Sequence, residues 1–226
     1  VDASIGGKTG VNHPKGKNLI GAFHQPRLVV IDPLTLNTLP VREFRAGMAE
    51  VIKYGIIYDA KLFRRLERDL PKLLVQDPAT LSTVIARCCQ IKAEVVGKDE
   101  KEAGLRAILN FGHTIGHGLE AISQYGKYLH GEAISIGQVA AAKVSSELTG
   151  LPAEAVDRIA AIFAATGLPT EVKLNATQTK RLFAAMKLDK KVSGGEIKFV
   201  LAESIGRVKI GQSVPDAAVR RALRKS

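Results

Sequence analysis

Apolar side chains recur at helical spacing along most of the chain. Between residues 41 and 58 an apolar residue returns every three or four positions, which predicts an amphipathic helix. The apolar positions of this helix are Phe44, Met48, Val51, Ile52 and Ile56. Asp59 is a good N-cap residue, and we expect it to begin a second helix that ends near Leu74.

The same pattern and its punctuation predict more helices toward the C-terminus. Asp77 and Pro78 form an N-cap and first-position pair that opens a long helix, whose apolar stripe is Leu81, Val84, Ile85, Cys88, Ile91 and Val95. Further helices are predicted from about residue 132 to 149, from Pro152 to Gly167, from Asn175 or Thr177 to Leu188, and after Ser213 and Pro215.

Three stretches do not follow the helical period. Residues 1–26 are rich in Gly, Lys and Asn and predict a turn-rich loop. Residues 27–33 form a short β-branched run closed by Asp-Pro, which predicts a buried strand of a parallel sheet. Residues 197–202 and 208–210 alternate around a short turn and predict a β-hairpin. The predicted fold is mainly α, with this small hairpin near the C-terminus. Because the chain barely supplies sheet partners for residues 27–33, and opens without Met, we expect an α/β half to be missing upstream.

The balance of charge points to anionic partners. The chain has 226 residues, 46% of them hydrophobic, and a net charge of +11. A solvated basic surface, a small anionic substrate or cofactor, and nucleic acid each fit such a charge. The Lys and Arg residues are spread along the chain without interleaved aromatic residues, so a small anion is favoured over nucleic acid.

The cysteines and the hydropathy of the chain indicate the cellular compartment in which we expect the protein. The only cysteines, Cys88 and Cys89, are adjacent and cannot form a disulfide framework. Their place on an apolar helical stripe predicts core packing rather than metal binding. A reducing cytoplasm is therefore expected. No apolar run approaches 18 residues, so no membrane span is predicted.

Histidines cluster in one region of the chain. His113 and His117 are four residues apart, which places them on one face of a helix, and His130 follows nearby. Glycines 112, 116 and 118 surround the first two, which indicates that another part of the molecule approaches this backbone closely. Glu50 lies on a separate predicted helix. Imidazoles with a carboxylate are the ligands of a catalytic divalent metal, most often zinc.

Spacing alone leaves two ligand sets open. His113 and His117 could both bind the metal, as in zincin proteases, but Thr114 stands where the catalytic glutamate of those enzymes belongs. Alternatively, one of them could join His130 and Glu50 in an open three-ligand site that acts as a Lewis acid.

Cationic and amide side chains accompany these candidates. They are Lys8, Lys17, Asn18, Lys53, Lys92, Arg106 and Asn110. Such a set suits a substrate that carries a phosphate and a carboxylate. Lys53 could instead form an ordinary surface ion pair with Glu50, three residues away.

Five sequence blocks, in order, resemble the 3-dehydroquinate synthase family. They are residues 2–9 (DASIGGKT), 17–21 (KNLIG), 47–55 (GMAEVIKYG), 109–117 (LNFGHTIGH) and 130–133 (HGEA). The resemblance covers essentially the whole chain. Sister sugar-phosphate cyclases and glycerol dehydrogenases share the wider fold, but they are not expected to match every block.

The resemblance implies a role for each candidate. It implies Glu50, His113 and His130 as zinc ligands, with cobalt as an alternative metal, and His117 as a histidine on the substrate side. It implies that substrate is bound and turned over by Lys53, Lys92, Arg106, Asn110 and one of Lys190 or Lys191. It also implies that Asp2, Lys8, Lys17 and Asn18 contact an NAD cofactor or lie beside it.

The resemblance also implies an activity. The family converts 3-deoxy-arabino-heptulosonate 7-phosphate to 3-dehydroquinate, with phosphate release, in the shikimate pathway, and a homodimer is expected. On this basis residues 1–40 would be the tail of an NAD-binding α/β domain, and residues 41–226 a helical metal- and substrate-binding domain. Without its upstream half we expect the chain to bind NAD weakly and not to turn over. The rival hypotheses are a sister cyclase, a non-catalytic basic module that binds nucleic acid, and a metal hydrolase without NAD.

Overall fold

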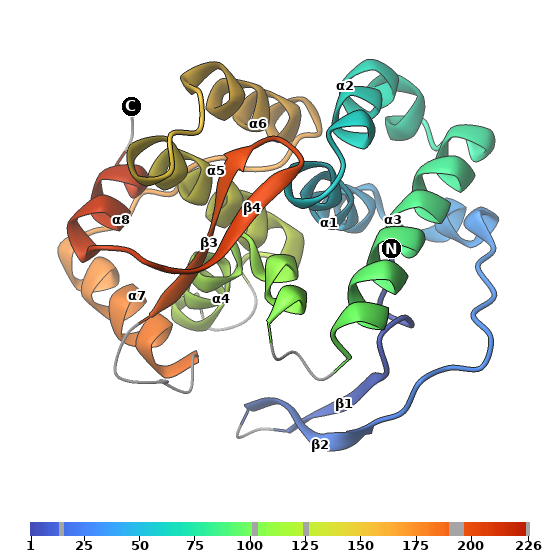
Figure 1. The fold of residues 1–226 in the computed structure, drawn as a ribbon, viewed down its shortest axis with the longest axis horizontal. Helices are drawn as coiled ribbons and strands as arrows, with labels where there is room; N and C mark the ends of the chain where they lie inside the picture. The colour runs from blue at the N-terminus through green and yellow to red at the C-terminus, as the bar shows by residue number, and fades with distance from the viewer. Residues whose placement is uncertain (14–15, 101–103, 124–126, 190–196, 225–226) are drawn as a thin grey trace.

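The computed structural model describes residues 1–13, 16–100, 104–123, 127–189 and 197–224, without the side chains of residues 9, 12–19 and 189. Helices dominate these residues (Figure 1). The α-helices are α1 (Val41–Ile57), α2 (Ala60–Leu74), α3 (Pro78–Lys98), α4 (His113–Ile122), α5 (His130–Leu148), α6 (Ala153–Ala165), α7 (Ala176–Asp189) and α8 (Asp216–Leu223). The 3-10 helix η1 (Pro33–Thr38) precedes α1, and a second one, η2 (Leu105–Asn110), connects α3 to α4. The mainly α fold class is confirmed.

Several helix boundaries follow from capping side chains. The Asp59 carboxylate accepts from the backbone amides of Lys61 and Leu62 at the start of α2. Asp77 accepts from the amide of Thr80 at the start of α3, with Pro78 in the first turn. These contacts satisfy amides that the helix itself cannot pair. The predicted starts of both helices are therefore confirmed.

The hairpin near the C-terminus is also confirmed. Strand β3 (Lys198–Ser204) pairs antiparallel with β4 (Arg207–Ser213). Residues 199–202 of β3 are buried on both faces: Phe199 and Leu201 pack in the core cluster formed by α4, α5, α7 and α8, and Val200 and Ala202 in the cluster formed mainly by α1, α2, α3 and α6. The hairpin thus packs against both core clusters of the helical fold. None of the described helices is long and apolar enough to cross a membrane.

The N-terminal region differs from its prediction. Strands β1 (Lys8–His13) and β2 (Gly16–Phe23) pair as an antiparallel hairpin where a loop was expected. Residues 27–33 were expected to form a buried parallel strand, but residues 27–32 are irregular and mostly exposed, with Leu28 79% and Val30 83% accessible, and Pro33 begins η1. No strand in the described part of the chain lies beside them. A strand needs ladder partners for its backbone groups, so this apolar run alone does not form one.

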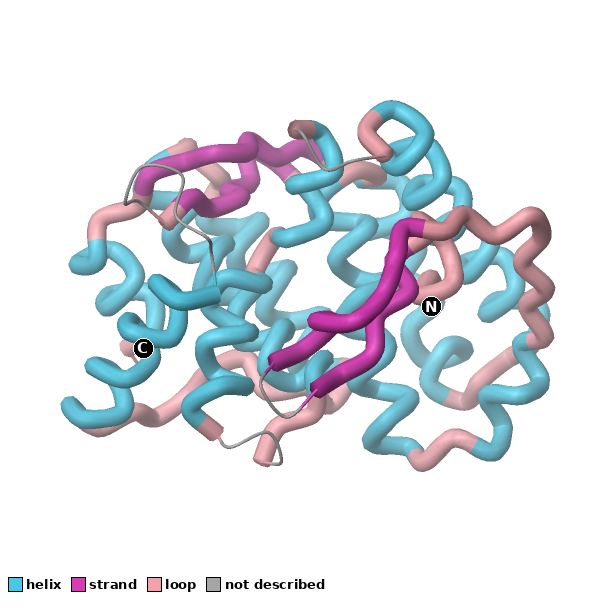
Figure 2. Tube along the Cα trace, turned by 90° about the horizontal axis from the view of Figure 1, so that it is seen from below, coloured by secondary structure: helices cyan, strands magenta, loops and turns pink. Residues whose placement is uncertain are grey.

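Figures 1 and 2 show this N-terminal hairpin along one side of the helices, with the exposed segment leading from β2 to η1. From η1 onward the chain packs against α3 and enters α1. Helix α1 lies in the centre, and it contacts α2, α3, α5 and α6. Eleven of its residues are buried.

Helix α5 approaches its neighbours closely because of small residues. A Cβ added at Gly131 would lie 1.9 Å from the Ala46 carbonyl oxygen of α1, and one at Gly137 would lie 2.1 Å from the Gly112 carbonyl oxygen. Only glycine permits such backbone contacts. The start of α4 is thereby held against the second turn of α5, and the first turn of α5 is held against α1.

Candidate metal centre

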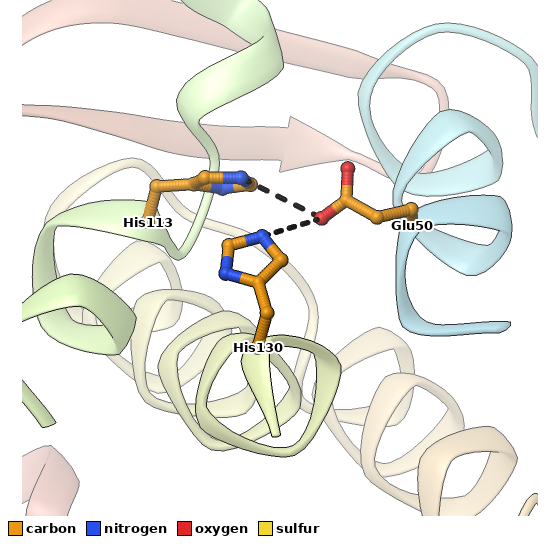
Figure 3. A group of neighbouring side chains, drawn as sticks. All are labelled: Glu50, His113 and His130. Atoms are coloured by element: carbon orange, nitrogen blue, oxygen red, sulfur yellow. Dashed lines mark ion pairs between the residues drawn. The ribbon is translucent and has the colours of Figure 1, made fainter. Parts of the chain in front are cut away.

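The first turns of α4 and α5 and the middle of α1 bring three candidate ligands together (Figure 3). Glu50 lies on α1, while His113 and His130 are the first residues of α4 and α5. Glu50 Oε1 is 3.5 Å from His113 Nε2 and 3.8 Å from His130 Nε2. One ligand atom from each of the three residues lies within 4.8 Å of the other two.

Both imidazoles are oriented through their other ring nitrogen. His113 Nδ1 lies 3.1 Å from the Phe111 carbonyl oxygen, and His130 Nδ1 lies 3.2 Å from Glu120 Oε2. Both partners accept hydrogen bonds, so each Nδ1 is the donor, and in the neutral ring Nε2 then presents a lone pair toward Glu50. A carbonyl or carboxylate behind the imidazole is the usual second contact of a metal-binding histidine.

The charges of the three residues also suit a cation. Burial raises the pKa of Glu50, but Lys53 and the two imidazoles outweigh burial and lower that pKa to about 2. Burial lowers the pKa of His113 to about 3, and Lys53 acts in the same direction. At neutral pH the set is therefore one carboxylate with a neutral His113, which is the protonation state that a divalent metal requires.

A zinc ion fits these donors. Ligands about 2 Å from a tetrahedral zinc are about 3.3 Å apart. The observed separations of 3.5 and 3.8 Å exceed this value by a few tenths of an ångström. Glu50 Oε1 is buried and makes no hydrogen bond among the described residues, while Oε2 accepts from Lys53 Nζ at 2.5 Å. Lys53, only 3% exposed, is thus part of the site rather than of a surface ion pair.

His117 lies beside this group without joining it. Its ring centroid is 5.3 Å from that of His113 and 5.9 Å from that of His130. Its ligand atoms fall instead in a second group with Glu120 and His130. The histidine that groups with His113 and Glu50 is therefore His130, and not His117 as a zincin-like site would have it.

Behind Lys53, the N-terminal segment enters the site. The Asp2 carboxylate accepts a hydrogen bond from the Tyr54 hydroxyl and lies 3.4 Å from Lys92 Nζ, which also donates to the Asp2 carbonyl at 2.8 Å. Burial lowers the pKa of Lys92, and Lys53 and Arg106 add to that effect against the attraction of Asp2. Lys53 and Arg106 are therefore close enough to Lys92 to affect its charge, while Lys92 pairs with Asp2 and Lys53 with Glu50.

Arg106 joins two loops at the edge of this region. It is 3% exposed, and its guanidinium donates to the carbonyl of Gly6 at 3.0 Å and to that of Glu100 at 2.8 Å. Gly6 adopts a positive φ of 101°, and a Cβ there would lie 2.7 Å from the guanidinium. Arg106 thus fixes the Gly-Gly turn relative to η2.

The remaining predicted residues are either exposed or outside the part of the chain that the structure describes. Asn110 is exposed at the end of η2, and Lys8 is exposed on β1. Lys17 and Asn18 belong to β2, but their side chains lie outside the described set, as do Lys190 and Lys191 altogether. The roles expected of these residues stay predictions.

Sequence reasoning missed two buried contributors. Glu120 follows His113 and His117 by seven and three residues, so its place on the same helical face was a usable signal. Tyr54 carried no such signal, because its partner Asp2 is 52 positions away in the sequence.

Comparison with known proteins assigns the family. A family model described as 3-dehydroquinate synthase C-terminal matches residues 47–192, and one described as 3-dehydroquinate synthase N-terminal matches residues 1–46. The chain belongs to the 3-dehydroquinate synthase family.

Relatives of the family span the whole chain. It is 54% identical to a 3-dehydroquinate synthase of Nostoc punctiforme over 225 residues, which are 99% of this chain and 62% of the relative. A 3-dehydroquinate synthase of Nitrosomonas europaea is 53% identical over 95% of this chain and 58% of its own length. The chain thus spans about three fifths of the curated relatives that it matches.

Solved structures show the same fold in sister enzymes. A 2-epi-5-epi-valiolone synthase from Streptomyces hygroscopicus with NAD+ and Zn2+ bound matches with a TM-score of 0.88 and 30% identity, over 99% of this chain and 62% of that one. A 2-deoxy-scyllo-inosose synthase complexed with carbaglucose-6-phosphate, NAD+ and Co2+ matches with a TM-score of 0.85 and 28% identity, over 99% and 63%.

Proposed function

We propose that this chain provides the metal- and substrate-binding region of a 3-dehydroquinate synthase. The enzyme would convert 3-deoxy-arabino-heptulosonate 7-phosphate to 3-dehydroquinate with release of phosphate. Family membership and more than 50% identity to two 3-dehydroquinate synthases support this activity. The NAD+ and Zn2+ bound to the valiolone synthase support NAD and zinc as cofactors, and the Co2+ bound to the inosose synthase supports cobalt as an alternative metal.

Glu50, His113 and His130 would hold the metal. Bound NAD would accept and return a hydride, while the metal would polarise the substrate oxygen at that carbon. Lys53 fixes one carboxylate oxygen of Glu50 and leaves the other directed toward the histidines. The two imidazoles are held by their Nδ1 atoms, so the three donors need little reorganisation when the metal binds.

The surrounding charges suit the substrate. Lys53 is buried and Lys92 is half-buried, they lie close to each other, and they would attract the phosphate and carboxylate of a sugar acid phosphate. Arg106 would shape the same region by holding the turn at Gly6. His117 is placed beside the ligands, where an imidazole can hold or move a proton on the substrate.

The observation that carries the proposal is the convergence of Glu50, His113 and His130. The test is phosphate release from the seven-carbon sugar phosphate, with NAD and zinc, by the protein in the full length that its gene encodes. We expect Glu50→Ala to abolish release. Glu147→Ala is the matched control, because Glu147 pairs with Arg221 on the surface and should leave release unchanged. Release that survives Glu50→Ala would contradict the proposal.

A sister cyclase is the second candidate, because both structural neighbours described above are cyclases of other names. Such an enzyme would act on a sugar phosphate without the carboxylate. Phosphate release from that substrate, and none from the heptulosonate, would favour it. A nucleic-acid module would instead show salt-dependent DNA or RNA binding that is indifferent to Glu50→Ala. The homodimer expected from the family stays a prediction.

A further inference from the structure

The three candidate ligands differ in how firmly the protein packs them. The His113 side chain is 12% exposed and that of Glu50 is 20% exposed, whereas that of His130 is 45% exposed. His113 and His130 each begin their helix and have no preceding helical turn to pack against, so the difference in exposure is what separates them. Packing alone therefore restrains the His130 ring less than it restrains the other two ligands.

One buried side chain supplies the missing restraint. Glu120 is 6% exposed and lies 3.2 Å from His130 Nδ1 through its Oε2. It reaches the site from α4, on the helical face that also carries His113 and His117. Taking a carboxylate out of water is costly unless a partner compensates it. Glu120 is thus fixed in place by α4 and can in turn fix a ring on α5.

We propose that Glu120 is a positioning residue that sets the orientation and tautomer of His130 for metal binding. Its carboxylate accepts a hydrogen bond from Nδ1–H, which leaves the Nε2 lone pair free to bind a metal on the side that faces Glu50. Glu120 does not contact the metal or the substrate in this role. The inference rests on the metal centre of the proposed function and adds a residue that determines how tightly this centre holds its ion.

The first test measures zinc affinity of the full chain by competition with a chromophoric chelator, which requires no catalytic turnover. Loss of a carboxylate behind a ligating histidine costs about 10- to 100-fold in metal affinity. We expect Glu120→Ala to bind zinc weaker by that factor, and Glu120→Gln, whose amide oxygen can still accept from Nδ1, to recover part of the loss. Glu147→Ala, on the surface of α5, should bind as the parent does.

The outcomes separate this inference from the proposed function. If the parent chain binds no zinc, or binds it equally after Glu50→Ala, the metal centre itself is wrong and the inference is overturned with it. If the parent binds zinc through Glu50, but folded Glu120→Ala binds within threefold of the parent, only the role of Glu120 is overturned. Cobalt substitution adds a second signal, because a misplaced His130 should change the visible absorption of the bound ion.

A measurement on the unmutated chain decides the case in which Glu120→Ala does not fold. Nitrogen-15 NMR distinguishes the two neutral tautomers of a histidine ring. The proposed role requires His130 in the metal-free chain to carry its proton on Nδ1. A proton on Nε2 at neutral pH would overturn the proposal without any variant.

Discussion

Gly131→Ala tests whether the close approach of α5 to α1 builds the metal centre. An alanine Cβ at residue 131 would lie 1.9 Å from the Ala46 carbonyl oxygen and 2.5 Å from its carbonyl carbon. Real Cβ atoms essentially never approach within 3.0 Å, so the two backbones must separate by about 1 Å or more. Neither contact is with a flexible side chain that could turn away.

The expected loss of stability follows from two opposed effects. Overpacking of this kind costs about 1–3 kcal/mol. Replacing a helical glycine by alanine returns up to about 1 kcal/mol. We therefore expect Gly131→Ala to lower the free energy of unfolding by about 1–2 kcal/mol, measured by urea denaturation of the metal-free chain.

The effect on the site should be larger than the effect on the fold. Residue 131 follows His130 directly, while Ala46 lies one helical turn before Glu50 on α1. A shift of about 1 Å exceeds the roughly 0.5 Å within which a ligand set must be held, so zinc affinity should fall at least about tenfold.

Gly97→Ala is the matched control. Gly97 is also helical, on α3, and an added Cβ there meets nothing within 4 Å. This variant should be as stable as the parent, or more stable by up to about 1 kcal/mol, and should bind zinc equally. A Gly131→Ala chain that matches Gly97→Ala in both stability and zinc affinity would refute the reasoning.

Three further predictions concern groups away from the ligands. Burial raises the pKa of the Asp59 carboxyl, but the α2 amides and Arg87 outweigh burial and lower this pKa overall. The stabilisation by Asp59 is therefore complete above the ordinary aspartate pKa of about 4, and it is lost as the pH falls through the lower pKa of the folded chain. Asp59→Ala should therefore cost about 1–2 kcal/mol in urea denaturation at pH 7 and progressively less toward pH 3; a cost that does not change with pH would contradict this. Arg106→Met should leave the buried Gly6 carbonyl without its donor, cost about 1–3 kcal/mol, and speed hydrogen exchange in residues 5–7, whereas unchanged exchange would show that the turn holds itself. Cys88 is fully buried and burial raises the pKa of its thiol, so a thiol reagent should modify Cys89 well before Cys88, and equal rates would mean that α3 opens readily.

The sequence by itself determined most of the helical architecture. The apolar period and the caps at Asp59 and Asp77 predicted α1, α2 and α3 nearly to the residue. These signals are local, because a capping carboxylate acts on amides two or three residues away. The hairpin of β3 and β4 was likewise predicted from alternation around a short turn.

Residues 27–32 show where local pattern fails. Their β-branched run has the composition of a buried strand, yet Leu28 and Val30 are exposed. Strand formation depends on partners that a local pattern does not contain. The pairing of β1 with β2 was missed for the opposite reason, since their Gly-, Lys- and Asn-rich sequence lacks the apolar alternation that marks a strand.

The ligand geometry was decided by tertiary structure. Residue spacing put His113 and His117 on one face of a helix and left open which of them meets Glu50. Glycine contacts hold α5 against α1 at Gly131 and α4 against α5 at Gly137, and this packing brings His113 and His130 to Glu50, while His117 and Glu120 group with His130. Helical periodicity fixes only which side chains share a face of their own helix. The packing of three helices fixes which faces meet, and the distances between donor atoms on different helices exist only in the folded chain.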